Sequence, residues 1–169
     1  MTFLAQQHVA LLQAAGWDAK IFCIYRSPKD QDIAFRAKRS KAQAFFSPHQ
    51  YFEAADIIHR TKGWNVAPAF WDDLHAASHV VMKKFKVTLE CGYDWGWDKA
   101  HIELKDWRTV RDRMDHRVPQ SKDLDFRFAE VLPAVWKTHT KSKSYEARQV
   151  ADPVETRARL AEMKNFEQE

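Results

Sequence analysis

Three titratable residues in the second half of the chain form the most enzyme-like group in the sequence. Glu90, His101 and Glu103 are expected on one face of a β-hairpin, in a register that sets Glu90 opposite Glu103. Two facing carboxylates raise the pKa of at least one of them, and a nearby imidazole can share the proton. This pattern suits a small hydrolase or a metalloenzyme, in which Asp94 could take part. A shifted register, or neutralisation by Arg127, would instead make the group structural.

A second group of metal-ligating residue types lies on the helix predicted after Pro68. Asp72, His75 and His79 recur at helical spacing, so one helix stripe presents a carboxylate and two imidazoles. The stripe lies opposite the apolar stripe, so we expect it to face solvent. A solvated polar face, or a pH-sensitive contact with a partner, explains the same residues. The sequence therefore predicts no bound metal ion and no other cofactor.

Signatures of other enzyme classes are missing from the sequence. It has no Gly-x-Ser-x-Gly motif, and its 4 glycines are not clustered as a phosphate-binding or dinucleotide-binding loop requires. Cys23 and Cys91 are too far apart for a Cys-x-x-Cys zinc motif. Both cysteines fall in predicted strands, so we expect buried, unreactive thiols rather than nucleophiles.

The basic residues are unevenly distributed along the chain. Lys and Arg total 27 against 23 Asp and Glu, a formal net charge of +4. Clustered cations attract phosphate backbones, because neutralising a phosphate releases condensed counterions. We expect three stretches to converge on one positive surface: Arg26, Lys29, Arg36, Lys38, Arg39 and Lys41; Lys83, Lys84 and Lys86; and Lys141 and Lys143.

Aromatic residues supply two further candidate contacts. Trp97 is expected at the tip of the hairpin, where burial in the monomer is difficult, so we name it as the candidate partner-binding residue. Tyr25, Phe35, Phe45 and Phe46 interleave with the first basic stretch. Exposed rings beside Arg and Lys form stacking platforms for single-stranded nucleic acid, whereas buried rings would only fill the core.

Periodicity and turn signals predict the elements that position these residues. Helices are expected over 3–15, 48–63, from Pro68 to about residue 85, and from a cap at Asp106 to before Pro119. Strands are expected over 20–25 as a central strand, over 33–37 with a return strand at 42–46, and over 123–128. In the hairpin at 87–104, Gly96-Trp97 fits a two-residue turn, which pairs Leu89 with Leu104 and Cys91 with Ile102.

The predicted fold class is α+β, with a small mixed or antiparallel sheet packed by helices. From residue 42 onward the order β–α(α)–β–β–α–β matches the split βαβ arrangement of ferredoxin-like domains. We expect one domain over 1–136, a polar linker over 137–151 and a C-terminal helix over 152–169. The aromatic strand motif of RNA-recognition domains is absent.

Three functions are open at this point. The leading expectation is a non-enzymatic protein that contacts nucleic acid or a nucleoprotein complex through its basic stretches. The alternative is an adaptor or inhibitor that binds another protein, of the kind phages and plasmids encode, with Trp97 as an anchor. The third is the small hydrolase or metalloenzyme described above. Few cysteines, no signal peptide and no apolar segment of membrane-spanning length predict a cytoplasmic protein without membrane contacts.

Overall fold

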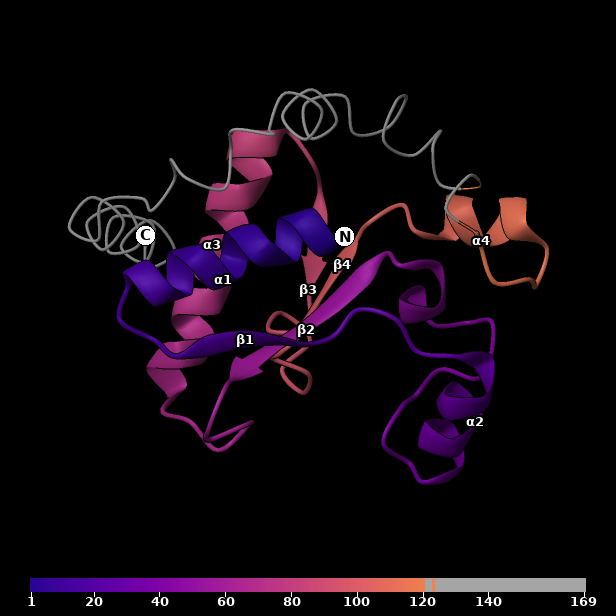
Figure 1. The fold of residues 1–169 in the computed structure, drawn as a ribbon, viewed down its shortest axis with the longest axis horizontal. Coiled ribbons are helices and arrows are strands. Elements are labelled where there is room, and N and C mark those ends of the chain that lie inside the picture. Colours follow the sequence, from indigo (N-terminus) through magenta and orange to yellow (C-terminus); the bar gives the residue numbers. More distant parts are fainter. Residues whose placement is uncertain (121–122, 124–169) are drawn as a thin grey trace.

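The computed structural model describes residues 1–120 and residue 123. Within them the expected α+β class is confirmed, with four α-helices and a four-stranded antiparallel sheet (Figure 1). The elements follow in the order α1 (Thr2–Ala14), β1 (Ala19–Cys23), α2 (Pro28–Arg36), the 3-10 helix η1 (Pro48–Tyr51), β2 (Ala54–His59), α3 (Pro68–Phe85), β3 (Leu89–Cys91), β4 (His101–Leu104) and α4 (Arg108–Met114). The expected linker, C-terminal helix and, apart from Asp123, the strand at 123–128 lie outside the described residues.

The sheet has the strand order β1-β2-β4-β3, with every neighbouring pair antiparallel. β4 therefore lies between β2 and β3, which run parallel to each other and are joined by α3. The full ferredoxin-like order is not confirmed. β1 was expected to be central but forms an edge of the sheet, and Phe22 on it is 52% exposed.

The two faces of the sheet have different surroundings. α1 packs against α3, β1 and β2, and Figure 1 shows α1 crossing α3. Leu4, Leu12 and Leu74 from these helices are buried in one core with Ile57 and Ile102 from the sheet. Asp56 precedes Ile57 in β2, and His101 precedes Ile102 in β4. Because side chains alternate along a strand, those of Asp56 and His101 point to the opposite face. This opposite face carries the polar groups described below.

The expected strand pair at 33–37 and 42–46 is wrong. Residues 28–36 form α2, because Ser27 accepts a hydrogen bond from the Asp30 amide at 3.1 Å and Pro28 occupies the first turn. The alternation of apolar residues predicted a strand, yet the buried residues are Gln31 and Ala34, at helical spacing.

The expected helix from Pro48 to Gly63 is also wrong. Only the single turn of η1 forms, and Phe52 then adopts a left-handed conformation with φ of 58° that ends it. The chain continues as β2, which pairs with β1 on one side and β4 on the other. The capping signal at Ser47-Pro48 therefore marks a turn rather than a long helix.

The hairpin register is confirmed, but its turn is not. Leu89 pairs with Leu104, and Cys91 pairs with Ile102. Residues 92–100 form an irregular loop instead of continuing the strands to a two-residue turn. Gly92 explains why the loop can close here, since a Cβ at this position would collide with the backbone carbonyl of Asp98.

The remaining helices agree with the sequence apart from one boundary. α1 and α3 form where they were expected. α4 begins at Arg108 with Trp107 as its N-cap, so the expected cap at Asp106 is wrong. In the described part of the chain, no helix combines the length and the apolar character needed to cross a membrane.

Candidate metal centre

Three side chains bring one electron-pair donor each to a single point on the polar face of the sheet. Nε2 of His49 lies 3.3 Å from Oδ1 of Asp56 and 3.3 Å from Nδ1 of His101. Nδ1 of His101 lies 3.1 Å from the same Asp56 oxygen. All three residues are buried. The three atoms thus form a nearly equilateral triangle in the interior.

The sheet and one turn build this triangle. Asp56 on β2 and His101 on β4 are directly opposed in the strand register, so their side chains share a face. His49 comes from η1, and the left-handed residue Phe52 turns the chain from η1 into β2. Tyr25 stacks on Phe52 with ring centroids 4.7 Å apart, which supports this turn from outside.

Hydrogen bonds on the far side of each imidazole fix which nitrogen carries its lone pair. Nδ1 of His49 lies 3.2 Å from the carbonyl oxygen of Ile24, so this nitrogen must donate. Nε2 of His101 lies 3.0 Å from Oε2 of Glu103 and must likewise donate to a carboxylate. Glu103 is held in turn by the Trp107 indole, which donates to Oε1 at 3.0 Å. In the neutral imidazoles, both remaining lone pairs therefore point to Asp56.

Either protons or a metal ion can satisfy these three donors. If each imidazole carries a proton on the nitrogen that faces Asp56, both can donate to Oδ1 of Asp56. Two cationic N–H groups then lie 3.3 Å apart at a single oxygen. One divalent ion satisfies all three atoms at once. Donor atoms on a tetrahedral zinc, with bonds of about 2.0–2.2 Å, lie roughly 3.3 Å apart, which matches the sides of the triangle. The backbone and carboxylate acceptors behind the imidazoles are the partners that histidine ligands of metals usually have.

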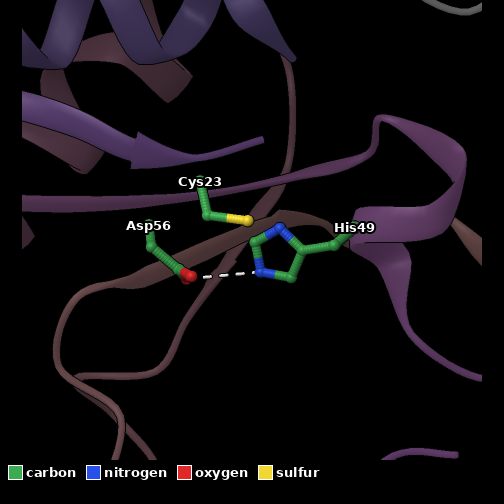
Figure 2. Close-up of side chains that lie close together, drawn as sticks. All are labelled: Cys23, His49 and Asp56. Atoms are coloured by element: carbon green, nitrogen blue, oxygen red, sulfur yellow. Dashed lines mark ion pairs between the residues drawn. The ribbon is translucent and has the colours of Figure 1, made fainter. Parts of the chain in front are cut away.

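Cys23 is the fourth candidate donor near this triangle. Its ligand atom lies within 4.8 Å of those of His49 and Asp56. Figure 2 shows the sulfur beside the His49 nitrogen that does not face Asp56. A metal ion bound to Nε2 of His49 would thus have Cys23 behind the imidazole rather than among its ligands. Cys23 was expected to be buried but is half-buried, whereas Cys91 is buried as expected.

The protonation of the three residues is strongly coupled. Burial lowers the pKa of His49, but the hydrogen bonds to Asp56 and Cys23 and the charge of Asp56 outweigh it and raise that pKa to about 10. Burial likewise opposes the charged form of Asp56, yet hydrogen bonds from His101 and His49 hold its pKa well below the usual range. The pKa of His101 is raised by Asp56 and Glu103 despite burial, while the charge of His49 works against this rise. Protons and a metal ion thus compete for the same three atoms.

Two charged side chains stand beside the triangle. Arg26 lies 3.7 Å from Oδ2 of Asp56 and donates to Gln31 at 3.2 Å. Asp98, in the loop before His101, has a pKa raised by burial, while the charge of His101 partly lowers it. A carboxyl group with a raised pKa beside a cavity is a candidate to accept and return a proton during a reaction.

A cavity of about 1340 Å³ opens over the triangle. His49, Asp56 and His101 line it together with Arg26 and Asp98. Seven large apolar residues are exposed in the described part of the chain, and six of them line this cavity: Phe22, Ile33, Phe46, Trp64, Trp95 and Trp97. Exposed apolar surface gathered at one concave site is typical of ligand binding.

The structure brings the predicted group of Glu90, His101 and Glu103 together. Glu90 pairs with Glu103 in the expected register, and His101 contacts Glu103. His101 and Glu103 are buried beneath the cavity. Sequence reasoning missed His49 and Asp56, since it assigned both to one helix. The polar run of Ser47 to Gln50 ahead of a buried strand was the available signal.

The rings of His75 and His79 lie 4.7 Å apart, but neither His79 nor Asp72 belongs to the group of donor atoms around His75. His75 is buried rather than solvent-facing, and its Nε2 contacts Asp94 at 3.0 Å. The loop of residues 92–100 covers this part of α3: the Tyr93 hydroxyl donates to Asp72 at 2.8 Å. The donor atoms gathered around His75 belong to Cys91 and Asp94.

The basic stretches do not form one surface in the described residues. Arg26, Arg39 and Lys41 line the cavity, and the remainder of the first stretch (Lys29, Arg36 and Lys38) lies on α2 and just after it. Lys83, Lys84 and Lys86 lie at the C-terminal end of α3, well away from α2 in Figure 1. Lys141 and Lys143 lie outside the described residues.

The aromatic candidates divide between packing and exposure. Trp97 is 51% exposed, stacks on Trp95 and carries the Lys41 ammonium 3.8 Å from its ring centre. Phe46 is also exposed, whereas Phe35 and Phe45 are half-buried. Tyr25 is exposed but does not line the cavity, whereas Phe46 and Trp97 line it together with Arg26, Arg39 and Lys41 of the first basic stretch.

Comparison with known proteins adds no relative to these observations. No protein-family model matches the chain, and no curated protein sequence matches it either.

Proposed function

We propose that the protein is a metal-dependent hydrolase whose metal ion, zinc by preference, is held by His49, Asp56 and His101. The observation that carries this proposal is the triangle of donor atoms, with sides of 3.1 to 3.3 Å, at the base of a large cavity. Three protein ligands leave one coordination position for water or substrate, as in catalytic zinc sites. This departs from the leading expectation of a non-enzymatic protein.

His49, Asp56 and His101 would hold the zinc ion, which would supply a Lewis acid to activate water and polarise a carbonyl group. Asp98 is the candidate general base: it takes a proton from the attacking water and returns it to the leaving group. The Arg26 guanidinium, close to Asp56, favours negative charge that develops on the substrate oxygen. The net reaction adds water across an amide or ester bond.

The cavity favours an extended substrate with apolar and anionic parts. Its volume exceeds that of most small-molecule sites, and exposed rings line it. Arg26, Arg39, Lys41 and Arg108 line it as well and would attract carboxylate or phosphate groups.

Metal analysis of the purified full-length chain, combined with a panel of amide and ester substrates, tests the proposal. We expect bound zinc, and hydrolysis that chelation abolishes and added zinc restores. His49→Ala, Asp56→Ala and His101→Ala should each lose this zinc and the activity, whereas the exposed His116→Ala should keep both. A zinc content per chain that none of the three substitutions lowers would refute the proposed ligands.

Nucleic-acid binding is a second candidate, supported by the Lys41–Trp97 contact at the cavity. If it holds, the full chain binds single-stranded DNA or RNA with an affinity that falls steeply as salt rises. Trp97→Ala should weaken this binding far more than Lys83→Ala, which lies away from the cavity. An equal effect of both substitutions, or no binding at low salt, would contradict it.

A further inference from the structure

We propose that His75, Cys91 and Asp94 form a second metal site, which takes a zinc-like ion and fastens the loop of residues 92–100 to α3. One donor atom from each residue lies within 4.8 Å of the other two. The site shares no residue with the triangle of His49, Asp56 and His101. Substitution of a ligand at one site would therefore leave the ligands of the other site in place.

Three different parts of the fold supply the three donors. His75 lies in the middle of α3, Cys91 ends β3, and Asp94 lies in the loop that follows. Nε2 of His75 and Oδ1 of Asp94 are already 3.0 Å apart, close to the spacing of two ligands on one ion. The Cys91 sulfur lies within 4.8 Å of both atoms, and the pairing of Cys91 with Ile102 fixes its backbone in the sheet.

The donor set selects the class of metal. A sulfur, an imidazole nitrogen and one carboxylate oxygen suit zinc and its neighbours in the transition series. Calcium and magnesium require mainly oxygen donors, so neither fits this set. The Asp94 side chain is 57% exposed, which leaves an entry path from solvent and room for a water ligand.

Neighbouring side chains hold the imidazole in place. Tyr93 stacks on His75 with ring centroids 4.5 Å apart and planes 10° apart. The Tyr93 hydroxyl is anchored by its hydrogen bond to Asp72, also on α3. The His75 ring is thus oriented before any ion binds, which lowers the conformational cost of binding.

A metal ion here would act on the cavity through the loop. Trp95, Trp97 and Asp98 follow Asp94 directly and line the cavity. Gly92 and Asp98 are in close backbone contact, so the loop is too compact for Asp94 to be fixed while Asp98 moves freely. This consequence, unlike the site itself, rests on the proposed function of Asp98 as the general base.

Cobalt substitution of the full chain tests the site, because a cobalt–thiolate bond gives a characteristic near-ultraviolet charge-transfer band. We expect this band in the wild-type protein and in Cys23→Ser, and its loss in Cys91→Ser. Asp94→Asn, at an exposed position that does not disturb the core, should weaken metal binding at this site by about tenfold or more. A band that is missing from the wild type, survives Cys91→Ser or disappears in Cys23→Ser would overturn the proposal.

Zinc stoichiometry separates this site from the proposed catalytic centre. We expect about two zinc ions per chain in the wild type and about one in either His75→Ala or His49→Ala. In His49→Ala the remaining ion should still give the thiolate band after cobalt exchange. If only His49→Ala lowers the zinc content, the second site is refuted and the proposed catalytic centre stands. If only His75→Ala lowers it, the catalytic centre is refuted and the second site stands.

Discussion

Asp56 and His101 occupy directly opposed positions on β2 and β4, and this register sets Oδ1 of Asp56 3.1 Å from Nδ1 of His101. Only the turn that carries His49 must be added to complete a set of three metal ligands. Because the sheet fixes two of the three donors, most of the site is pre-organised by backbone hydrogen bonds rather than by flexible loops.

Metal affinity should rise with pH. His49, with a pKa of about 10, is protonated at neutral pH unless a metal ion displaces the proton. Each metal ion bound at the triangle should therefore release protons, and its affinity should increase from pH 6 towards pH 9, by roughly tenfold per pH unit for each proton released. Competition titrations against a chromophoric chelator in this range measure the slope. An affinity independent of pH would contradict the protonated state assigned to His49.

Substitution of the residue behind His101 should weaken the metal centre without removing a ligand. Glu103→Gln replaces the carboxylate that accepts the His101 proton, so zinc affinity should fall by about 10- to 100-fold. Trp107→Phe, which removes the indole donor to Glu103 together with part of a buried ring but leaves the carboxylate in place, should have a smaller effect in the same titration. Unchanged affinity in Glu103→Gln would show that the His101 orientation does not depend on this contact.

Asp98→Asn should separate catalysis from metal binding. The amide cannot accept a proton, so hydrolysis should fall by about 10²- to 10⁴-fold while zinc remains bound. The pH–rate profile of the wild type should show an acidic limb above the ordinary pKa of Asp, because burial raises the pKa of Asp98. If Asp98→Asn retains full turnover, another group, such as Glu90 on the same cavity wall, is the base.

The stability of the metal-free fold should fall in acid because of His8. This residue is fully buried, and burial lowers its pKa to about 4 despite a hydrogen bond to the Leu4 carbonyl. A buried neutral histidine stabilises the fold above pH 6.5 and loses that contribution as pH falls towards 4, at a cost of about 3 kcal/mol between pH 7 and pH 4.

Denaturant unfolding of the chelator-treated chain measures this loss. His8→Gln should lower stability at pH 7 but remove most of the pH dependence between pH 7 and pH 4. The raised pKa of His49 acts in the other direction, since its contribution is present below pH 6.5 and is lost only as pH rises towards 10. Equal pH dependence in wild type and His8→Gln would contradict the assignment to His8.

Local sequence signals predicted those parts of the fold that depend on short-range pattern. The apolar stripe after Pro68 gave α3, and the alternation after residue 87 gave the pairing of Glu90 with Glu103. The same alternation failed at residues 33–37, where a Ser-Pro helix start determines the structure. The spacing of apolar residues thus predicts an element correctly where one periodicity, that of a helix or that of a strand, dominates the segment.

The metal ligands depend on information that local pattern does not carry. Asp56 lies in β2, a strand whose six residues are mostly buried and whose identity depends on pairing with β1 and β4. Placed in a helix, as the capping signal at Ser47 suggested, His49 and Asp56 would not meet His101. His101 and Glu103 were found from the hairpin register alone, but their burial required the cavity walls that α2 and the loop before β4 contribute.

A crystal structure of the zinc-loaded chain, with anomalous diffraction recorded at the zinc absorption edge, shows whether the triangle binds a metal ion. We expect an anomalous peak about 2.0–2.2 Å from Nε2 of His49, Oδ1 of Asp56 and Nδ1 of His101. A zinc-loaded crystal without a peak at this position, with the two imidazoles bonded only to Asp56, would contradict it.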